Sequence, residues 1–217
     1  MNITSLTGVG AISIKAIGTV NYGIIGGGVN IATANAGYSG DTRVLAGTLT
    51  LTNATGVNMT SWLGTSTSDI VMGDSSGIQS TRFVLAPSTL GATFTRGFTT
   101  QAGNGGIAVV GITANNGGTF SGNLTLNKSI YLVGPNSIAS PTTFSGLVSK
   151  GSGAVDAVSV VTSGDRNGYI QLTNAGNAYD GGTVVGAGLL VASAGSLGSG
   201  NALVETGALR LASTTSL

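Results

Sequence analysis

Residues 177–192 read NAYDGGTVVGAGLLVA, and this stretch decides the fold that we predict for the chain. It joins an aromatic residue, a small polar residue and a glycine to two short apolar runs. The aromatic–polar–glycine motif recurs along the 217 residues, at Tyr38-Ser39-Gly40, Phe120-Ser121-Gly122, Phe144-Ser145-Gly146 and Tyr179-Asp180-Gly181. A motif that repeats along a chain predicts a fold built from stacked copies of one small unit.

We interpret this motif as a corner between two strands. The aromatic ring fills the corner, the glycine bends the chain, and a Thr-x-Val sequence begins the next strand after Tyr38 and after Tyr179. Stacking of the rings on sugars is the alternative role. The residues to which we assign the structural role are Tyr38, Gly40, Phe120, Gly122, Phe144, Gly146, Tyr179 and Gly181.

Short runs that alternate apolar residues with Thr or Ser occur along most of the sequence, and this period of two is typical of half-buried strands. Gly, Asn, Asp or Ser separates the runs every few residues. No stretch has the pattern of an amphipathic helix, so we predict an all-β fold. The clearest predicted strands are 11–14, 48–52, 107–110, 124–126, 130–133, 158–161, 189–191 and 209–211.

The C-terminal third repeats with a shift of 20 residues. This shift also places Leu190 over Arg210, at a position expected to point outward. Stacking of equivalent positions predicts a parallel β-solenoid with roughly 20–24 residues per rung, the rungs lying about 4.8 Å apart. The superposed pairs are Val184 on Val204, Leu189 on Leu209, Val191 on Leu211 and Ala192 on Ala212.

The pattern N-x-Y-x-G-G-T-x-V-x-x-G-x-L, which begins at Asn177 and precedes Leu197-Gly198-Ser199-Gly200, resembles the autotransporter-associated β-strand repeat. Residues 174–211 match best, residues 31–52 match well, and residues 114–132 match loosely. The resemblance implies a right-handed parallel β-helix in a secreted bacterial surface protein. It also implies that the repeat is a structural stalk without catalytic residues.

The composition excludes several function classes. Charged residues make up 7% of the chain and the net charge is +1, so electrostatic binding of nucleic acid is not expected. The chain has no Cys and no His, which excludes thiol nucleophiles, Ser-His-Asp triads and zinc sites built on these ligands. A chain without Cys is compatible with export before folding. Because the chain lacks Cys and His, we predict no cofactor.

Seven carboxylates are the remaining candidates for chemistry. Glycoside cleavage needs two of them facing each other across a bond, whereas Asp41 and Asp180 fall in turn positions of the repeat. Asp69 and Asp74 form the one close pair, in a Ser-rich loop, where a weak cation site is the alternative to turn capping. We predict no catalytic and no metal-binding residue. The full set is Asp41, Asp69, Asp74, Asp156, Asp165, Asp180 and Glu205.

For two further patterns we prefer a purely structural role. The glycine runs at 26–28 and 103–106 lack the lysine and the helix of a phosphate loop, so we assign them to corners. Threonines at 48–52, 93–95 and 99–100 could form a flat ice-binding face, but the pattern does not continue to positions 190, 191 and 210. Ordinary outward-facing strand threonines are therefore the preferred interpretation.

We predict a single domain over residues 1–217. Residues 55–105 depart from the repeat and contain Trp62, Met59 and Met72. They form either irregular rungs, which we prefer, or a loop-rich insertion packed on the rod.

The expected function is that of a non-enzymatic structural or adhesive protein, located outside the cell or on the bacterial cell surface. No capping helix or charged cap is visible at either end of the sequence, which suggests a stalk piece or a subunit that joins copies of itself end to end or edge to edge. Carbohydrate or a host surface is the other expected partner. The alternatives are a β-helix that binds or cleaves polysaccharide, and a transmembrane β-barrel suggested by low charge and alternation.

Overall fold

The computed structural model describes residues 2–3, 10, 12–15, 28–53, 58–76, 78–103, 106–154, 156–162 and 168–212. These residues form twenty β-strands and one short 3-10 helix, η1 (Met59–Leu63). Neighbouring strands pair in parallel throughout the described registers. The predicted all-β class with parallel strands is confirmed. Within the described part of the chain, no helix is long and apolar enough to cross a membrane.

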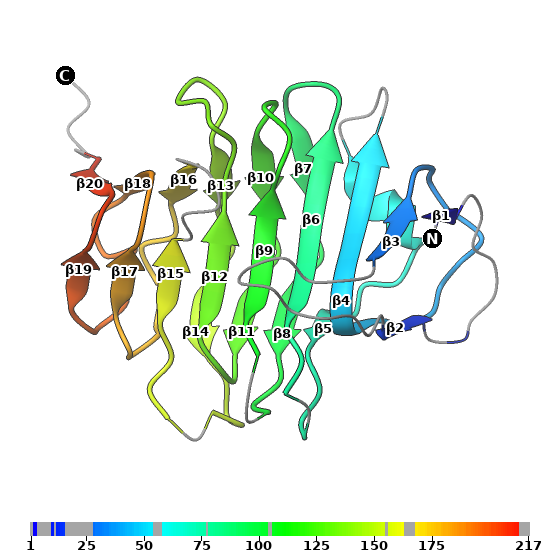
Figure 1. The fold of residues 1–217 in the computed structure, drawn as a ribbon, viewed down its shortest axis with the longest axis horizontal. Helices are drawn as coiled ribbons and strands as arrows, with labels where there is room; N and C mark the ends of the chain where they lie inside the picture. Colours follow the sequence, from blue (N-terminus) through cyan, green and yellow to red (C-terminus); the bar gives the residue numbers. More distant parts are fainter. Residues whose placement is uncertain are drawn as a thin grey trace.

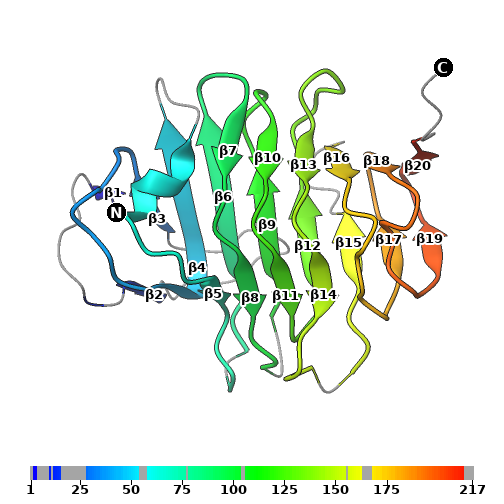
Figure 2. The same cartoon turned by 180° about the vertical axis from the view of Figure 1, so that it is seen from behind.

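The strands lie in three columns (Figures 1 and 2). The first column holds β2 (Ile12–Lys15), the N-terminal half of β4 (Thr42–Asn53), β5 (Ile70–Met72), β8 (Phe98–Thr100), β11 (Leu124–Leu126) and β14 (Val148–Lys150). The second holds β1 (Asn2–Ile3), β3 (Gly28–Ile31), the C-terminal half of β4, β6 (Thr81–Pro87), β9 (Ala108–Ile112), β12 (Ile130–Val133), β15 (Val160–Thr162), β17 (Thr183–Val185) and β19 (Ala202–Val204). The third holds β7 (Ala92–Phe94), β10 (Gly118–Phe120), β13 (Thr142–Phe144), β16 (Tyr169–Leu172), β18 (Leu189–Ala192) and β20 (Ala208–Leu211).

Strand β4 belongs to two columns because it turns in the middle. Its residues Arg43 and Val44 pair with β5, whereas its residues from Gly47 onward pair with β6. Gly47 has a φ angle of 81°, a conformation that side-chain-bearing residues rarely adopt. The turn at Gly47 therefore joins the first and second columns into one 14-stranded sheet, beside the 6-stranded sheet of the third column.

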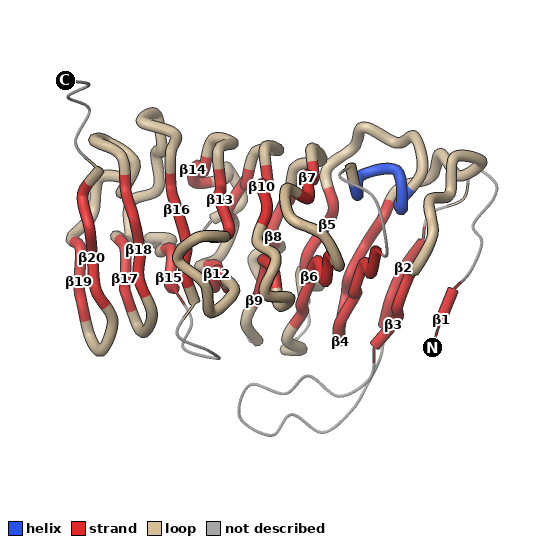
Figure 3. Tube along the Cα trace, turned by 90° about the horizontal axis from the view of Figure 1, so that it is seen from above, coloured by secondary structure: helices blue, strands red, loops and turns tan. Residues whose placement is uncertain are grey.

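From β5 to β16 the chain visits the three columns in turn, and this order is compatible with a β-solenoid. Figure 3 shows the same succession from above. The sequence distance between paired residues is 28 for Ile70 and Phe98, 24 for Leu124 and Val148, and 20 for Tyr169 and Leu189. The predicted spacing of 20–24 residues thus covers only some of the registers.

The stack narrows towards β20. Residues 173–182 connect the third column to the second, and their one contact of strand type with the first column is a bridge between Ala178 and Ser149. Residues 193–201 connect β18 to β19 without a strand. The last layers therefore have two strands each, and the first column ends at β14.

The core lies between the columns and is apolar along its length. In most strands from β5 to β18, alternate residues point inward and are buried, because successive side chains of a strand alternate between its faces. The rings of Phe120 and Phe144 stack in register at a centroid distance of 5.1 Å. Phe83, Phe94 and Phe98 continue this aromatic cluster on the N-terminal side, with centroid distances of 4.9 to 5.9 Å.

The predicted register of the C-terminal third is wrong by one residue. Leu189 pairs with Ala208, Leu190 with Leu209 and Ala192 with Leu211, a shift of 19 residues instead of 20. The cause is the length of a connection, because nine residues (193–201) precede β19 whereas ten (173–182) precede β17. Leu190 is fully buried and does not lie over Arg210. The pairs that replace the remaining predicted ones are Val184 with Leu203 and Val191 with Arg210.

In the segment 55–105, the described residues supply η1 and strands β5 to β8, which pair within the same three columns. Asn58 pairs with Thr93, so η1 follows a short parallel contact with the third column. The Trp62 indole donates a hydrogen bond of 2.9 Å to the Thr52 carbonyl, which ties η1 to β4.

Candidate binding surfaces

The four aromatic residues of the repeat motif lie at corners of the stack. Each stands four residues before the first residue of a strand, at β4, β11, β14 and β17. Their side chains are at most 3% exposed. Buried rings have no face available for a sugar, so the geometry gives no support to sugar stacking at Tyr38, Phe120, Phe144 and Tyr179.

The motif glycines stand where neighbouring layers approach each other closely. A Cβ atom added at Gly146 would overlap the Gly122 carbonyl, and one at Gly122 would overlap the Arg96 carbonyl. A Cβ at Gly181 would overlap the Ser159 hydroxyl at 2.5 Å. These positions require glycine because there is no space for a side chain between the layers.

Tyr38 and Tyr179 share the motif but begin strands of different columns. The Tyr38 hydroxyl donates 2.6 Å to the carbonyl of Asp41, before the first-column half of β4. The Tyr179 hydroxyl lies 2.6 Å from the Thr183 hydroxyl, at the start of β17 in the second column. Burial raises the pKa of Tyr179 to about 12.

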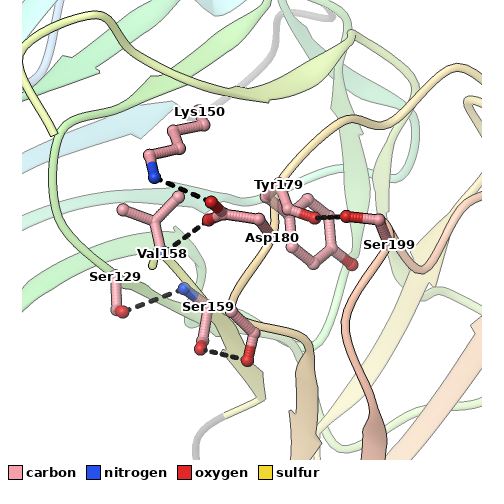
Figure 4. A network of polar contacts seen from close by, with 8 residues as sticks. Ser129, Lys150, Val158, Ser159, Tyr179, Asp180 and Ser199 are labelled. Atoms are coloured by element: carbon pink, nitrogen blue, oxygen red, sulfur yellow. Dashed lines mark hydrogen bonds and ion pairs between the residues drawn. The ribbon is translucent and has the colours of Figure 1, made fainter. Parts of the chain in front are cut away.

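A small polar network surrounds Asp180 (Figure 4). Its carboxylate accepts 2.7 Å from the Lys150 ammonium and 3.0 Å from the Val158 backbone N–H. These hydrogen bonds, the one from Lys150 first, hold the pKa of Asp180 below its usual value. Ser159 donates to the Gly181 carbonyl at 2.8 Å, so the network joins the layers of β14, β15 and β17.

Arg96 is a buried residue that sequence reasoning missed. It takes the corner position at which other layers carry the motif glycine, two residues before β8, and its side chain is 3% exposed. Its Nε donates 2.8 Å to the Ser68 carbonyl, its Nη1 lies 3.3 Å from the Thr42 hydroxyl, and its Nη2 has no hydrogen-bond partner. Burial lowers the pKa of Arg96. The sequence could have indicated this corner through Phe94, which lies four residues before β8, the spacing at which the motif aromatics precede their strands.

Asp69 and Asp74, the close pair of the sequence, have separate hydrogen-bond partners. Asp69 accepts 2.9 Å from the Thr99 hydroxyl, and Asp74 accepts 3.1 Å from the backbone N–H of Ser76. Among the described residues, no three acidic side chains gather into a set that could hold a metal ion. Asp165, with Gly26, Gly27, Asn104 and Gly105 of the predicted glycine corners, lies outside the described residues.

The described residues line at least two recesses on the surface. One of about 370 Å³ lies over the short turn 127–129, between the longer connections after β8 and β14, and Lys128 and Asp156 line it together with Asn127 and Ser129. Burial lowers the pKa of Lys128. The other, of about 510 Å³, is lined by Ile138, Tyr169, Leu189, Thr206 and Ala208, with Gly188 and Gly207.

The outward rows of the three columns differ in chemistry. In the third column Thr93, Thr119 and Thr143 pair in register, after which Gln171 continues the row. The first column shows Thr99, Thr125 and Ser149. The second column instead carries an apolar row, made of Val109, Tyr131, Val161, Val184 and Leu203. Within this row Val109 is buried, in a small apolar cluster with Val84 and Val133.

The last layer of the stack is exposed. This layer, which we name the end rung, comprises β19, the turn 205–207 and β20. Leu203, Val204 and Leu211 are 52%, 44% and 65% exposed. Among the described residues, Ile78, Leu90 and Ile138 are the other exposed large apolar side chains, and each lies in a connection between strands.

No family model, curated protein or solved structure that was compared with this chain matches it. The geometry of the described residues therefore carries the functional argument.

Proposed function

We propose that the chain is a right-handed parallel β-solenoid of the autotransporter-associated repeat type, with a non-enzymatic, structural or adhesive role at a bacterial cell surface. The observation that carries the proposal is the register of three parallel columns around one apolar core. Such a stack places every strand's backbone hydrogen bonds between layers and leaves the outward rows free for contact. We expect roughly 20–24 residues per rung in part of the stack, since paired residues lie 24 apart for Leu124 and Val148 and 20 apart for Tyr169 and Leu189, but 19 apart for Leu189 and Ala208.

The outward rows support contact with neutral, hydroxyl-rich or apolar surfaces. Two columns expose threonine and serine, and the charged residues of the chain are few and mixed in sign. A rod of this kind has little electrostatic repulsion against a copy of itself. Self-association and contact with carbohydrate or a host surface are therefore the partners that we propose.

The test of the proposed role combines shape and location. We expect small-angle scattering of the purified chain to give an elongated particle, and protease treatment of intact source cells to remove the protein. A compact particle, or protection from protease in intact cells, would overturn the proposal.

A second candidate function is polysaccharide binding or cleavage. The recess at Lys128 and Asp156 favours it, because an ammonium and a carboxylate beside Asn127 and Ser129 suit hydroxyl and carboxylate groups of a sugar. Incubation with neutral and acidic polysaccharides, followed by assay of new reducing ends and of retained sugar, separates this activity from the structural role. New reducing ends that disappear in Asp156→Asn would favour the enzyme.

A further inference from the structure

The recess over the turn 127–129 lies in the middle of the stack, between the layers of β8 and β14. The connection after β8 has seven residues (101–107) and the one after β14 has nine (151–159), whereas the connection after β11 has three. The two longer connections therefore border the short one and enclose about 370 Å³. Ligand sites in proteins usually begin at about 300 Å³, so the recess has room for one small ligand group.

The floor of the recess is fixed by hydrogen bonds that belong to the fold. The backbone N–H of Asn127 donates to the Thr100 hydroxyl at 3.0 Å, and the Asn127 Oδ1 atom accepts 2.9 Å from the Gly153 N–H. The Ser129 hydroxyl accepts 2.9 Å from the Ser159 N–H, a contact that Figure 4 shows. The turn is thus held to both neighbouring layers before any ligand binds.

Three polar groups of the recess remain available after these bonds are made. Because Gly153 bonds its Oδ1 atom, Asn127 presents its Nδ2 amide as a donor, and Ser129 keeps its hydroxyl hydrogen as a second donor. Asp156 is exposed, and its carboxylate has no hydrogen-bond or ion-pair partner among the described residues. Each sugar hydroxyl both donates and accepts a hydrogen bond, so adjacent hydroxyls match this mixed set.

The charges of the recess favour a neutral sugar over an acidic one. Lys128 also lines the recess, but its ammonium lies 3.5 Å from the position that a Cβ at Gly73 would take, next to the end of β5. Its side chain therefore runs towards the N-terminal layers, whereas Asp156 belongs to the connection on the C-terminal side. The exposed charge on that side is a carboxylate, which repels the carboxylate of an acidic sugar.

The recess has the groups for binding a sugar but not those for hydrolysing it. Hydrolysis of a glycosidic bond needs two carboxylates, one on either side of the bond. Asp156 is the one carboxylate among the described residues that line the recess. The recess therefore fits retention of a polysaccharide without hydrolysis.

We propose that this recess binds a neutral, hydroxyl-rich sugar unit of a polysaccharide. Asp156 accepts hydrogen bonds from two neighbouring sugar hydroxyls, while Asn127 and Ser129 donate to sugar oxygens. The inference rests on the carbohydrate contact that the proposed function includes, and it assigns that contact to one site and one class of sugar.

The experiment titrates the full chain with soluble polysaccharides by isothermal calorimetry. Three of them are neutral (a glucan, a mannan and a galactan), and the fourth is the acidic polygalacturonate. Asp156→Ala removes the acceptor of the recess. Glu205→Ala is the matched control, since Glu205 is also exposed and lies in the turn between β19 and β20. We expect wild type and control to bind at least one neutral polysaccharide alike, and Asp156→Ala to bind it about tenfold more weakly.

A wild-type chain that binds none of the neutral polysaccharides would overturn this inference, and so would tighter binding of polygalacturonate. Neutral binding that Asp156→Ala leaves unchanged would refute the recess and leave the carbohydrate contact to another surface. Circular dichroism verifies that the variants fold, and small-angle scattering is measured on the same samples. An elongated particle that binds no sugar refutes the recess site alone, whereas a compact particle refutes the proposed solenoid.

Discussion

Gly122 shows how one residue fixes the distance between layers. A Cβ atom added at Gly122 would overlap the Arg96 carbonyl of the neighbouring layer, so the two layers would have to move apart. We predict that Gly122→Ala lowers the free energy of unfolding by about 1–3 kcal/mol, the usual cost of overpacking. Gly176→Ala is the control, because its Cβ would lie 3.3 Å from the Asn174 side chain and 3.7 Å from the Leu147 side chain, without overlapping the backbone of a neighbouring layer. Urea unfolding of both variants measures the difference, and equal stabilities would contradict the close approach.

Tyr179 is predicted to make stability sensitive to alkaline pH. Its pKa is raised from 10 to about 12 by burial, so the folded chain keeps the phenol proton where the unfolded chain loses it. The stabilisation is present below pH 10 and is lost as the pH rises toward 12. We expect Tyr179→Phe to weaken this loss in thermal melts recorded across that window. At neutral pH the variant should lose about 0.5–1.5 kcal/mol with the hydrogen bond to Thr183.

Asp180 should make the stability of the fold sensitive to acidic pH. Its folded pKa is lowered, so its contribution is present above the unfolded pKa and is lost as the pH falls through the folded pKa. Asp180→Asn should therefore flatten the acid limb of the melting temperature, and added salt should reduce the difference from wild type because the pair with Lys150 is solvent-accessible. An acid limb that Asp180→Asn leaves as steep as in wild type would contradict this assignment.

At the scale of elements, the two faces of strand β13 are expected to contribute unequally to stability. Phe144 points inward and stacks on Phe120, whereas Thr143 points outward and bonds the Gln171 side chain at 3.1 Å. We predict that Phe144→Ala costs about 3–5 kcal/mol in unfolding free energy. Thr143→Ala should cost well under half of that, and the reverse order in chemical denaturation would refute the inward assignment.

Strands could be predicted from sequence where alternation was strong. The predicted runs at 124–126 and 130–133 coincide with β11 and β12. Strands β5, β7 and β8 were missed because their sequences, Ile-Val-Met, Ala-Thr-Phe and Phe-Thr-Thr, lack the strong apolar–polar alternation of Leu-Thr-Leu in β11. Their existence depends on pairing with neighbours far along the chain.

Register was harder to predict than strand position, since it depends on the connections. One residue fewer before β19 than before β17 moves the pairing of Leu189 from Leu209 to Ala208. Tyr38 and Tyr179 carry the same motif, although the strands that follow them lie in different columns. The similarity of the two segments reflects the same corner structure. It does not indicate the column to which the next strand belongs.

At the scale of the whole molecule, the surfaces proposed for function were only partly visible beforehand. The exposure of Leu203, Val204 and Leu211 in the end rung could not be predicted without the register. The apolar outward row of the second column was likewise hidden, because Val109, Tyr131 and Val161 come from three strands separated by variable loops. The recess at Lys128 depends on the unequal lengths of adjacent connections.

The central claim is that the strands stack in register, layer upon layer. The chain has no cysteine, so spin labels can be attached at engineered pairs on the outward row of the third column. Thr93 pairs with Thr119, and Thr119 pairs with Thr143. Electron paramagnetic resonance should show strong dipolar broadening for the two adjacent pairs, at about 5 Å, and weaker broadening for positions 93 and 143, at about 10 Å. Equal broadening for all three pairs, or none, would contradict the stacked columns.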